Sequence, residues 1–234
     1  MEKKKVSEHI NELRFRIILT AIIFIFLFIV GFILSDKIMQ KINEDLLVFD
    51  NAILIATHPI EYFIAKLNIG VFFAIIFSLP FILFQIYLFL KPGLTKKEIK
   101  VLKISMIAGF FLFVLGFLFS YFVVLKFIVL FFGSLTKEGG IENFWDVNEF
   151  VNFVFMSNII MGIIFEIPII SLALVKVGFV TVETLKTNRG YVIIANFIIA
   201  AIITPTPDPF TQIIVALPMC ILYEISIWVA KIFG

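Results

Sequence analysis

The sequence consists largely of apolar runs, several of them long enough to cross a lipid bilayer. A helical span needs about 20 apolar residues, each adding about 1.5 Å. Backbone polar groups inside a bilayer must pair within the segment, so such runs are expected to form α-helices. Hydrophobic residues make up 62% of the 234-residue chain and charged residues 15%, against about one-half and one-quarter in soluble domains. We therefore expect one all-α integral membrane domain over residues 1–234.

Six apolar runs define the expected transmembrane helices. They cover residues 17–34, 64–90, 102–132, 150–175, 191–203 and 210–233. The last two are separated by Thr204-Pro205-Thr206-Pro207-Asp208-Pro209, where the prolines cannot continue a helix. The fifth run is too short for a full bilayer, so either it is half of a buried hairpin or the membrane thins around it. The alternative is a four-span protein with a re-entrant C-terminal hairpin.

The lysines and arginines orient these spans. Cytoplasmic loops of membrane proteins carry an excess of basic residues. With the N-terminus inside, most of the 19 basic residues fall on the inner side, and those outside are Lys37, Lys41, Lys66, Lys126 and Lys137. We therefore expect both termini in the cytoplasm. No small-x-small cleavage site follows the first run, so we expect it to be a retained span rather than a signal peptide.

Two outer loops carry apolar residues of their own. In the first, Ile38, Met39, Ile42 and Leu46 repeat at helical spacing. This spacing predicts a short amphipathic helix lying on the outer surface. The second loop ends with Phe144 and Trp145 just before the fourth span, where interfacial aromatic residues are expected.

Two acids stand on the basic inner side. Glu12 precedes the first span and is spaced i,i+4 from Arg16, so a local ion pair of about 0.2–0.5 kcal/mol is the simplest interpretation. Glu98 lies three residues after Thr95, which matches a helix capping box. The alternative is that each carboxylate receives a cationic partner, since Glu98 is retained among Lys96, Lys97, Lys100 and Lys103.

Several polar residues fall within or beside the later spans. Glu166 lies deep in the fourth span before Pro168, and a carboxylate inside a bilayer must be protonated, paired or exposed to a wet cavity, which makes it a functional candidate. The alternative is a neutral, hydrogen-bonded packing residue, with a helix kink at Pro168. Glu224 is a weaker candidate of the same kind, and Gln85 could join two helices by hydrogen bonding. Asp208 and Gln212 flank the proline-rich turn. Asp208 is more simply interpreted as a turn acid or the N-cap of the last helix.

Other kinds of site have little support in the sequence. The chain shows no zinc-ligand spacing, phosphate-binding loop or nucleophile elbow, so we expect no metal, cofactor or enzymatic activity. Its single cysteine, Cys220, lies in an apolar stretch and is expected to be a small buried residue. The net charge of +2 gives no reason to expect nucleic-acid binding. We find no internal repeat of the kind that marks secondary transporters.

Five motifs, in order along the chain, resemble those of the TatC family, the core integral subunit of the twin-arginine protein translocase. They are His9-Ile10-x-Glu12-Leu13-Arg14-x-Arg16; Pro80, Gln85 and Phe89-x-x-Pro92-Gly93-Leu94-x-x-x-Glu98; Phe165-Glu166-x-Pro168; Thr204-Pro205 with Asp208-x-x-x-Gln212; and Ile214, Pro218 and Tyr223-Glu224-Ile225. Each motif is weak alone, but their order and their positions among six spans make the resemblance specific.

The resemblance implies a cupped six-helix fold, N-in/C-in, with short fifth and sixth spans. It implies that Glu12 and Glu98 bind the arginine pair of a signal peptide, with Phe89, Arg14 and Arg16 beside them. The residues implied as intramembrane polar or partner contacts are Glu166, which would face a hollow, Gln85, Gln212 and Asp208.

The implied function is a non-enzymatic receptor and scaffold in the cytoplasmic membrane of a prokaryote. It would bind twin-arginine signal peptides of folded cargo, recruit single-span partners of the TatA/TatB type and self-associate in a receptor complex, with export driven by the proton-motive force. The alternative is an ion-coupled transporter that uses Glu166 as a proton site.

Three departures from the family pattern lie on the outer side. The first outer loop reads Asn43-Glu44-Asp45-Leu46, without the proline common there. Lys126 stands where a proline is also common, and the turn from Thr204 to Asp208 is one residue longer than in some members. These departures bear on outer-face contacts more than on signal binding.

Overall fold

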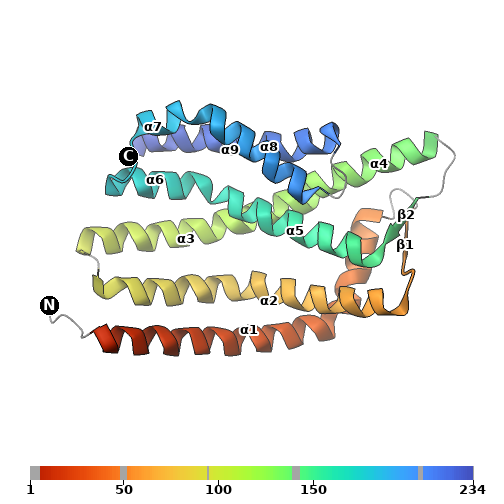
Figure 1. Ribbon diagram of the computed structural model, residues 1–234, viewed down its shortest axis with the longest axis horizontal. Coiled ribbons are helices and arrows are strands. Elements are labelled where there is room, and N and C mark those ends of the chain that lie inside the picture. Colours follow the sequence, from red (N-terminus) through yellow and green to blue (C-terminus); the bar gives the residue numbers. More distant parts are fainter. Residues whose placement is uncertain (1–5, 48–51, 94, 139–142, 205–207, 234) are drawn as a thin grey trace.

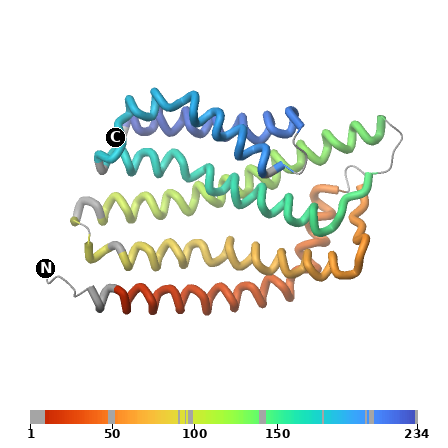
Figure 2. The backbone as a smooth tube through the Cα atoms, viewed as in Figure 1, coloured from red at the N-terminus to blue at the C-terminus, as the bar shows by residue number. Residues whose placement is uncertain are grey.

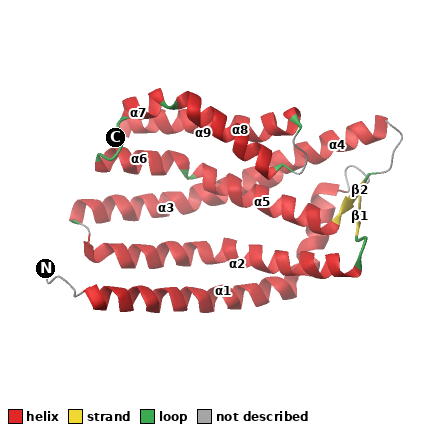
Figure 3. Ribbon diagram, in the orientation of Figure 1, coloured by secondary structure: helices red, strands yellow, loops and turns green. Residues whose placement is uncertain are grey.

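The computed structural model of this chain is a bundle of long helices that lie side by side (Figures 1 and 3). It describes residues 6–47, 52–93, 95–138, 143–204 and 208–233. The helices are α1 (Val6–Ile42), α2 (Pro59–Leu90), α3 (Lys96–Phe119), α4 (Lys126–Glu138), α5 (Val147–Phe165), α6 (Ile167–Val177), α7 (Val182–Thr187), α8 (Arg189–Ile203) and α9 (Pro209–Phe233). Two π-helical segments, η1 (Asn43–Leu47) and η4 (Ser120–Leu125), a 3₁₀ turn, η3 (Lys91–Gly93), and two short strands, β1 (Ile53–Ile55) and β2 (Phe144–Asp146), complete the described fold.

The expected transmembrane runs correspond to these helices. Five helical stretches are long and apolar enough to cross a membrane: Ile10–Leu47, Pro59–Gly93, Ile99–Glu138, Val147–Lys176 and Pro209–Ile232. The fifth expected span is the shorter apolar helix Arg189–Ile202, as predicted. The sixth expected span, residues 210–233, corresponds to α9, which runs for 25 residues without ending at Pro218 and is therefore longer than the short sixth span that the resemblance implied. A helix of this length favours a separate span over the re-entrant hairpin.

The start of α1 and the end of α9 lie at the same end of the bundle (Figures 1 and 2). The end of α2, the start of α3 and helix α7 lie at this end as well. Because the inner lysines and arginines belong to these segments, we call it the basic end of the molecule. The opposite end, which we call the outer end after the orientation predicted from the sequence, holds β1 and β2, which pair in parallel with Ile53 opposite Phe144.

The predicted amphipathic stretch in the first outer loop exists, but its predicted surface position is wrong. The helix α1 continues through it without interruption and ends at η1. Met39, Ile42 and Leu46 are buried in the main apolar core together with Leu125 and Ile128 of the third span. The apolar face therefore packs against protein, because η4 and α4 reach over it at the outer end of the bundle.

Two interruptions direct the chain through the middle of the bundle. The third span changes from α3 to α4 through the π-helical segment η4, and such segments commonly bend helices. The fourth span breaks at Glu166, so that α5 ends there and α6 begins. Pro168 falls in the first turn of α6, where its missing N–H is tolerated. The kink expected at Pro168 is thus present.

Close packing of α5 on α3 depends on small residues. A Cβ atom added to Gly116 of α3 would lie 2.7 Å from the ring of Phe165, and one added to Gly162 of α5 would lie 2.7 Å from the ring of Phe113. Glycine at these two places lets the two backbones approach, as is common between membrane helices. The C-terminal part of α5 is therefore held closely against the second half of α3.

Candidate functional site

The side chain of Arg16 joins α1 to α2 near the basic end. Its Nη1 donates a hydrogen bond to Oε1 of Gln85 across 2.9 Å, and its Nη2 donates to the carboxylate of Glu12 one turn earlier. The predicted Glu12–Arg16 ion pair is therefore present, with side-chain exposures of 19% and 17%. Gln85 is 8% exposed and joins the two helices as predicted. The sequence indicated the local pair, whereas only the fold brought Gln85 to it.

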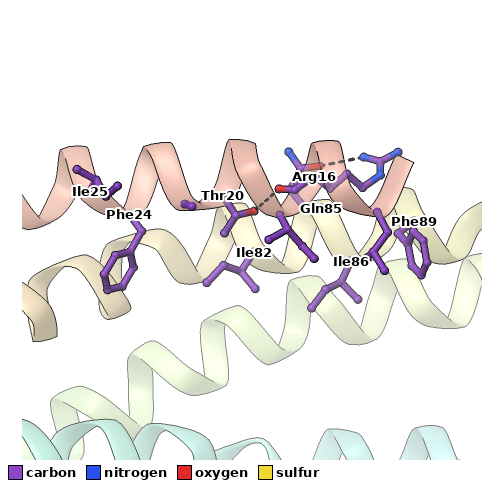
Figure 4. Close-up of a pocket in the computed structure, with 11 residues that line it drawn as sticks. Arg16, Thr20, Phe24, Ile25, Ile82, Gln85, Ile86 and Phe89 are labelled. Atoms are coloured by element: carbon purple, nitrogen blue, oxygen red, sulfur yellow. Dashed lines mark hydrogen bonds between the residues drawn. The ribbon is translucent and has the colours of Figure 1, made fainter. Parts of the chain in front are cut away.

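A groove of about 470 Å³ begins at this cluster and runs along the contact between α1 and α2 (Figure 4). Its walls are mainly apolar, and Phe24, Ile82 and Ile86 line it together with Arg16, Gln85 and Phe89. Thr20 lines the groove as well. Its hydroxyl donates a hydrogen bond to the backbone oxygen of Arg16 at 2.8 Å, so the hydroxyl hydrogen is already paired within α1. The groove thus offers an apolar surface with a polar cluster at one end.

Sequence reasoning missed most of the residues that line the groove. On α1, Arg16, Thr20 and Phe24 follow one another at intervals of four residues. On α2, Ile82, Gln85, Ile86 and Phe89 recur at the i, i+3, i+4, i+7 spacing of one helix face. This periodicity was visible in the sequence, but in an apolar span every helix face is apolar, so the pattern could not indicate which face borders a groove.

The other residues predicted to bind the signal peptide lie in the groove wall or in segments that follow or precede it in the sequence. Phe89 lines it near the end of α2, and Arg14 is exposed on α1. Glu98 belongs to the first turn of α3, which begins after the short turn η3. The side chain of Glu98 lies outside the described part of the structure, so its predicted capping box with Thr95 stays a prediction. Figure 1 places the starts of α1 and α3 at the same end of the bundle.

Glu166 occupies a different part of the molecule. It lies at the break between α5 and α6 and is partly buried, and its Oε2 would lie 2.5 Å from a Cβ atom added to Gly109 of α3. The missing side chain at Gly109 therefore makes room for the carboxylate against α3. Glu166 does not line the groove between α1 and α2.

Asp208 has a structural role that the sequence predicted. Its Oδ1 accepts hydrogen bonds from the backbone N–H groups of Phe210 at 3.0 Å and Thr211 at 2.9 Å, which is the pattern of an N-cap for α9. Gln212 lies in the first turn of α9 and is partly exposed. The residues 205–207 of the proline-rich turn lie outside the described ranges. Neither Asp208 nor Gln212 lines the groove.

Glu224 is exposed at the basic end and forms an ion pair with Arg189 across 2.9 Å. Beside it, the hydroxyl of Tyr223 donates to the backbone oxygen of Leu185 at 2.9 Å. These two contacts attach the segment containing α7 and the start of α8 to α9. Glu224 is therefore better explained as a structural ion-pair partner of Arg189 than as an intramembrane site.

Across the described residues, no three His, Cys, Asp or Glu side chains gather as a metal site would require.

Known proteins resemble this chain throughout its length. The sequence profile described as Sec-independent protein translocase protein (TatC) matches residues 8–218. The Bacillus subtilis protein named Sec-independent protein translocase protein TatCy is 34% identical over 234 residues, covering 99% of this chain and 90% of that protein. An Akkermansia muciniphila protein named Sec-independent protein translocase protein TatC is 37% identical over 175 residues, covering 75% of this chain but only 50% of that longer protein.

A solved structure described as the crystal structure of the twin-arginine translocase receptor TatC superposes with a TM-score of 0.84. It is 32% identical in sequence, and the match covers 96% of this chain and 98% of that chain. This agreement in fold and in sequence supports a multi-pass translocase protein over the ion-coupled transporter.

Proposed function

The chain belongs to the TatC family of Sec-independent protein translocase proteins, and from this premise we propose that it is the receptor and scaffold subunit of a twin-arginine translocase. In this role it binds the twin-arginine signal peptides of folded cargo proteins. Glu12 and Glu98 receive the two arginines at the basic end, and Phe89 contacts the peptide beside them.

The contact that carries this proposal is the one between Glu12 and the guanidinium of Arg16. A planar guanidinium already reaches this carboxylate, which supports the approach of an arginine from the signal peptide. An arginine presents a fork of donors that fits a carboxylate in two-point contact, whereas lysine presents a single point charge. A site built from two such acids would therefore prefer an arginine pair to a lysine pair.

The groove between α1 and α2 supports the same proposal. Export signals consist of a positively charged segment followed by an apolar one. Here the polar cluster of Glu12, Arg16 and Gln85 continues directly into apolar walls formed by Phe24 and Ile82. The apolar segment that follows the arginine pair would thus contact the apolar walls of the groove, while the arginine pair stays at the polar cluster.

The contact with Arg16 also sets a condition on binding. The guanidinium of Arg16 already occupies part of the Glu12 carboxylate, so an incoming arginine must share or displace it. A carboxylate has about four acceptor sites and can accept from two guanidinium groups. Arg16 and the neighbouring Arg14 therefore adjust the affinity of the site as well as its shape.

The partners and the location follow from the rest of the molecule. We propose that single-span subunits of the TatA/TatB type bind in the bilayer and that copies of the chain self-associate in a receptor complex. Exposed apolar residues on α8 and α9, such as Ile198, Ile202 and Leu217, provide surface for helix packing.

The basic end faces the cytoplasm of a prokaryote, so both termini lie inside and the protein resides in the cytoplasmic membrane. Export is driven by the proton-motive force, and the intramembrane polar residues Glu166, Gln85, Gln212 and Asp208 contribute to partner contacts.

The test uses the purified full-length chain in lipid nanodiscs and a fluorescent twin-arginine signal peptide, with a twin-lysine peptide for comparison. Glu12→Gln and Glu98→Gln are each expected to weaken binding about 10- to 100-fold, because a hydrogen bond to a charged group contributes about 1.5–3 kcal/mol. Glu183→Gln removes an exposed acid of α7 and is expected to bind like the parent. Unchanged binding by the Glu12→Gln/Glu98→Gln double variant, or equal binding of the two peptides, would overturn the proposal.

A further inference from the structure

A second groove lies between α3 and α6 at the basic end, separate from the one between α1 and α2. It measures about 310 Å³. Lys100 of α3 and Lys176 of α6 line it, and Ile104, Ser105, Ile169 and Leu172 form much of its wall. The proposed signal-binding residues are absent from its lining. The motifs discussed above do not account for this groove.

The groove exists because α3 and α6 separate toward the basic end. Gly116 and Gly162 hold α5 against α3, and the contact between Gly109 and Glu166 continues this close approach to the break in the fourth span. Beyond the break α6 takes a new direction, and Figure 1 shows it diverging from α3. The result is a wedge that is closed near Glu166 and open between Lys100 and Lys176.

Both helices turn the same kind of face toward this wedge. On α3, Lys100 and Ile104 are four residues apart, and on α6, Lys176 and Leu172 are four residues apart. Residues at this spacing share one face of a helix. Each helix therefore carries a cation at the open end and an aliphatic residue one turn deeper. Ser105 adds a partly buried hydroxyl to the wall.

The two cations have no ion-pair partner among the side chains that the structure describes. Both lysines are exposed. Two positive charges at the rim of one groove repel each other, and an anion bound between them would relieve this repulsion. The apolar walls beneath would in turn be covered by hydrocarbon.

We propose that this groove binds an anionic phospholipid of the cytoplasmic leaflet, with its phosphate between Lys100 and Lys176 and one acyl chain along Ile104, Ile169 and Leu172. Basic pockets between membrane helices at the cytoplasmic surface suit such headgroups. The depth of apolar wall favours a lipid over a soluble anion, which would leave that wall uncovered. The inference goes beyond signal-peptide recognition and does not depend on it.

The proposal is tested by native mass spectrometry of the full-length protein in detergent, titrated with dioleoyl phosphatidylglycerol or dioleoyl phosphatidylcholine. Preferential binding of phosphatidylglycerol is expected. Lys100→Gln and Lys176→Gln should each weaken it about fivefold, and the double variant about 25-fold. Lys186→Gln, which removes an exposed lysine of α7 at the same end, should have no effect. A double variant that binds like the parent, or an equal loss in Lys186→Gln, would overturn the site.

Two further measurements separate a lipid from a free phosphate group. Ala173, which also lines the groove, can be changed to Trp to fill it while both lysines stay. Phosphatidylglycerol binding should then fall, and the melting temperature should stay within a few degrees of the parent. Millimolar glycerol 3-phosphate, which lacks acyl chains, should not displace the lipid. Full displacement by glycerol 3-phosphate, or unchanged lipid binding by a folded Ala173→Trp variant, would contradict the proposal.

Discussion

The guanidinium of Arg16 on α1 donates a hydrogen bond to the amide oxygen of Gln85 on α2 across 2.9 Å. Gln85 is nearly buried, and Arg16 lies 69 positions away in sequence. The same guanidinium contacts Glu12. One side chain thus connects the proposed signal-binding acid, the α1–α2 contact and the polar end of the groove.

The stability of the α1–α2 contact should depend on the acceptor at position 85. Gln85→Leu leaves a donor of Arg16 without its partner in a place with little water, so the free energy of unfolding should fall by about 1–3 kcal/mol. Gln85→Glu keeps an acceptor oxygen and should be the more stable of the two variants. Denaturant unfolding in mixed micelles measures both. A Leu variant as stable as the Glu variant would show that the hydrogen bond contributes little.

Arg16→Gln should strengthen the binding of a twin-arginine peptide. The change removes the internal guanidinium from Glu12, so the peptide no longer has to displace it. Partly exposed ion pairs are worth about 0.2–1 kcal/mol, which corresponds to an increase in affinity of about 1.5- to fivefold. Lys186→Gln removes an exposed positive charge of α7, outside the proposed site, and serves as the control in peptide titrations at matched salt. A decrease to the level of Glu12→Gln would instead assign Arg16 the role of positioning Glu12.

Gly109→Ala should destabilise the protein at the break in the fourth span. The new Cβ atom would lie 2.5 Å from Oε2 of Glu166, so the carboxylate or α3 must move, at a cost of about 1–3 kcal/mol. Gly190→Ala is the matched control, since a Cβ atom there meets no atom within 4 Å.

A double-mutant cycle identifies the source of that cost. Adding Glu166→Ala to Gly109→Ala removes the clashing carboxylate, so the double variant should lose less than the sum of the two single variants. Simple additivity of the unfolding free energies would mean that the strain lies elsewhere.

The start of α9 should depend on the side chain of Asp208. Asp208→Ala removes the acceptor for the N–H groups of Phe210 and Thr211 and should cost about 0.5–2 kcal/mol. Asp208→Asn retains an acceptor oxygen and should cost a few tenths of a kcal/mol at most. Amide hydrogen exchange in the first turn of α9 should rise in the Ala variant alone. Equal exchange in both variants would exclude the capping role.

Features that depend on neighbours along the chain were predictable. The ion pair of Glu12 and Arg16 follows from i,i+4 spacing, the kink at Glu166 from Pro168, and the cap of α9 from the position of Asp208 before it. Each arises from contacts within about one helical turn, so the local sequence contains both partners.

Features that depend on how helices pack were predicted less well. The stretch containing Met39, Ile42 and Leu46 was correctly expected to be amphipathic, but periodicity alone does not distinguish a membrane surface from a protein core. Its burial depends on η4 and α4, whose positions follow from the bend in the third span. The continuation of α9 through Pro218 is likewise decided by packing, since a proline inside a helix either ends it or is tolerated according to its surroundings.

The order of apolar, basic and acidic residues along the chain already indicates that it spans a membrane, which end is basic, and where acids interrupt that pattern. Hydrocarbon imposes these features, because it admits long apolar helices and penalises isolated charge. Helix packing, in contrast, brings Gln85 to Arg16, opens a groove at that contact, and separates α3 from α6 so that a second groove lies between two lysines. These arrangements follow from close packing at a few glycines and from one broken helix, which bring together side chains far apart in the sequence.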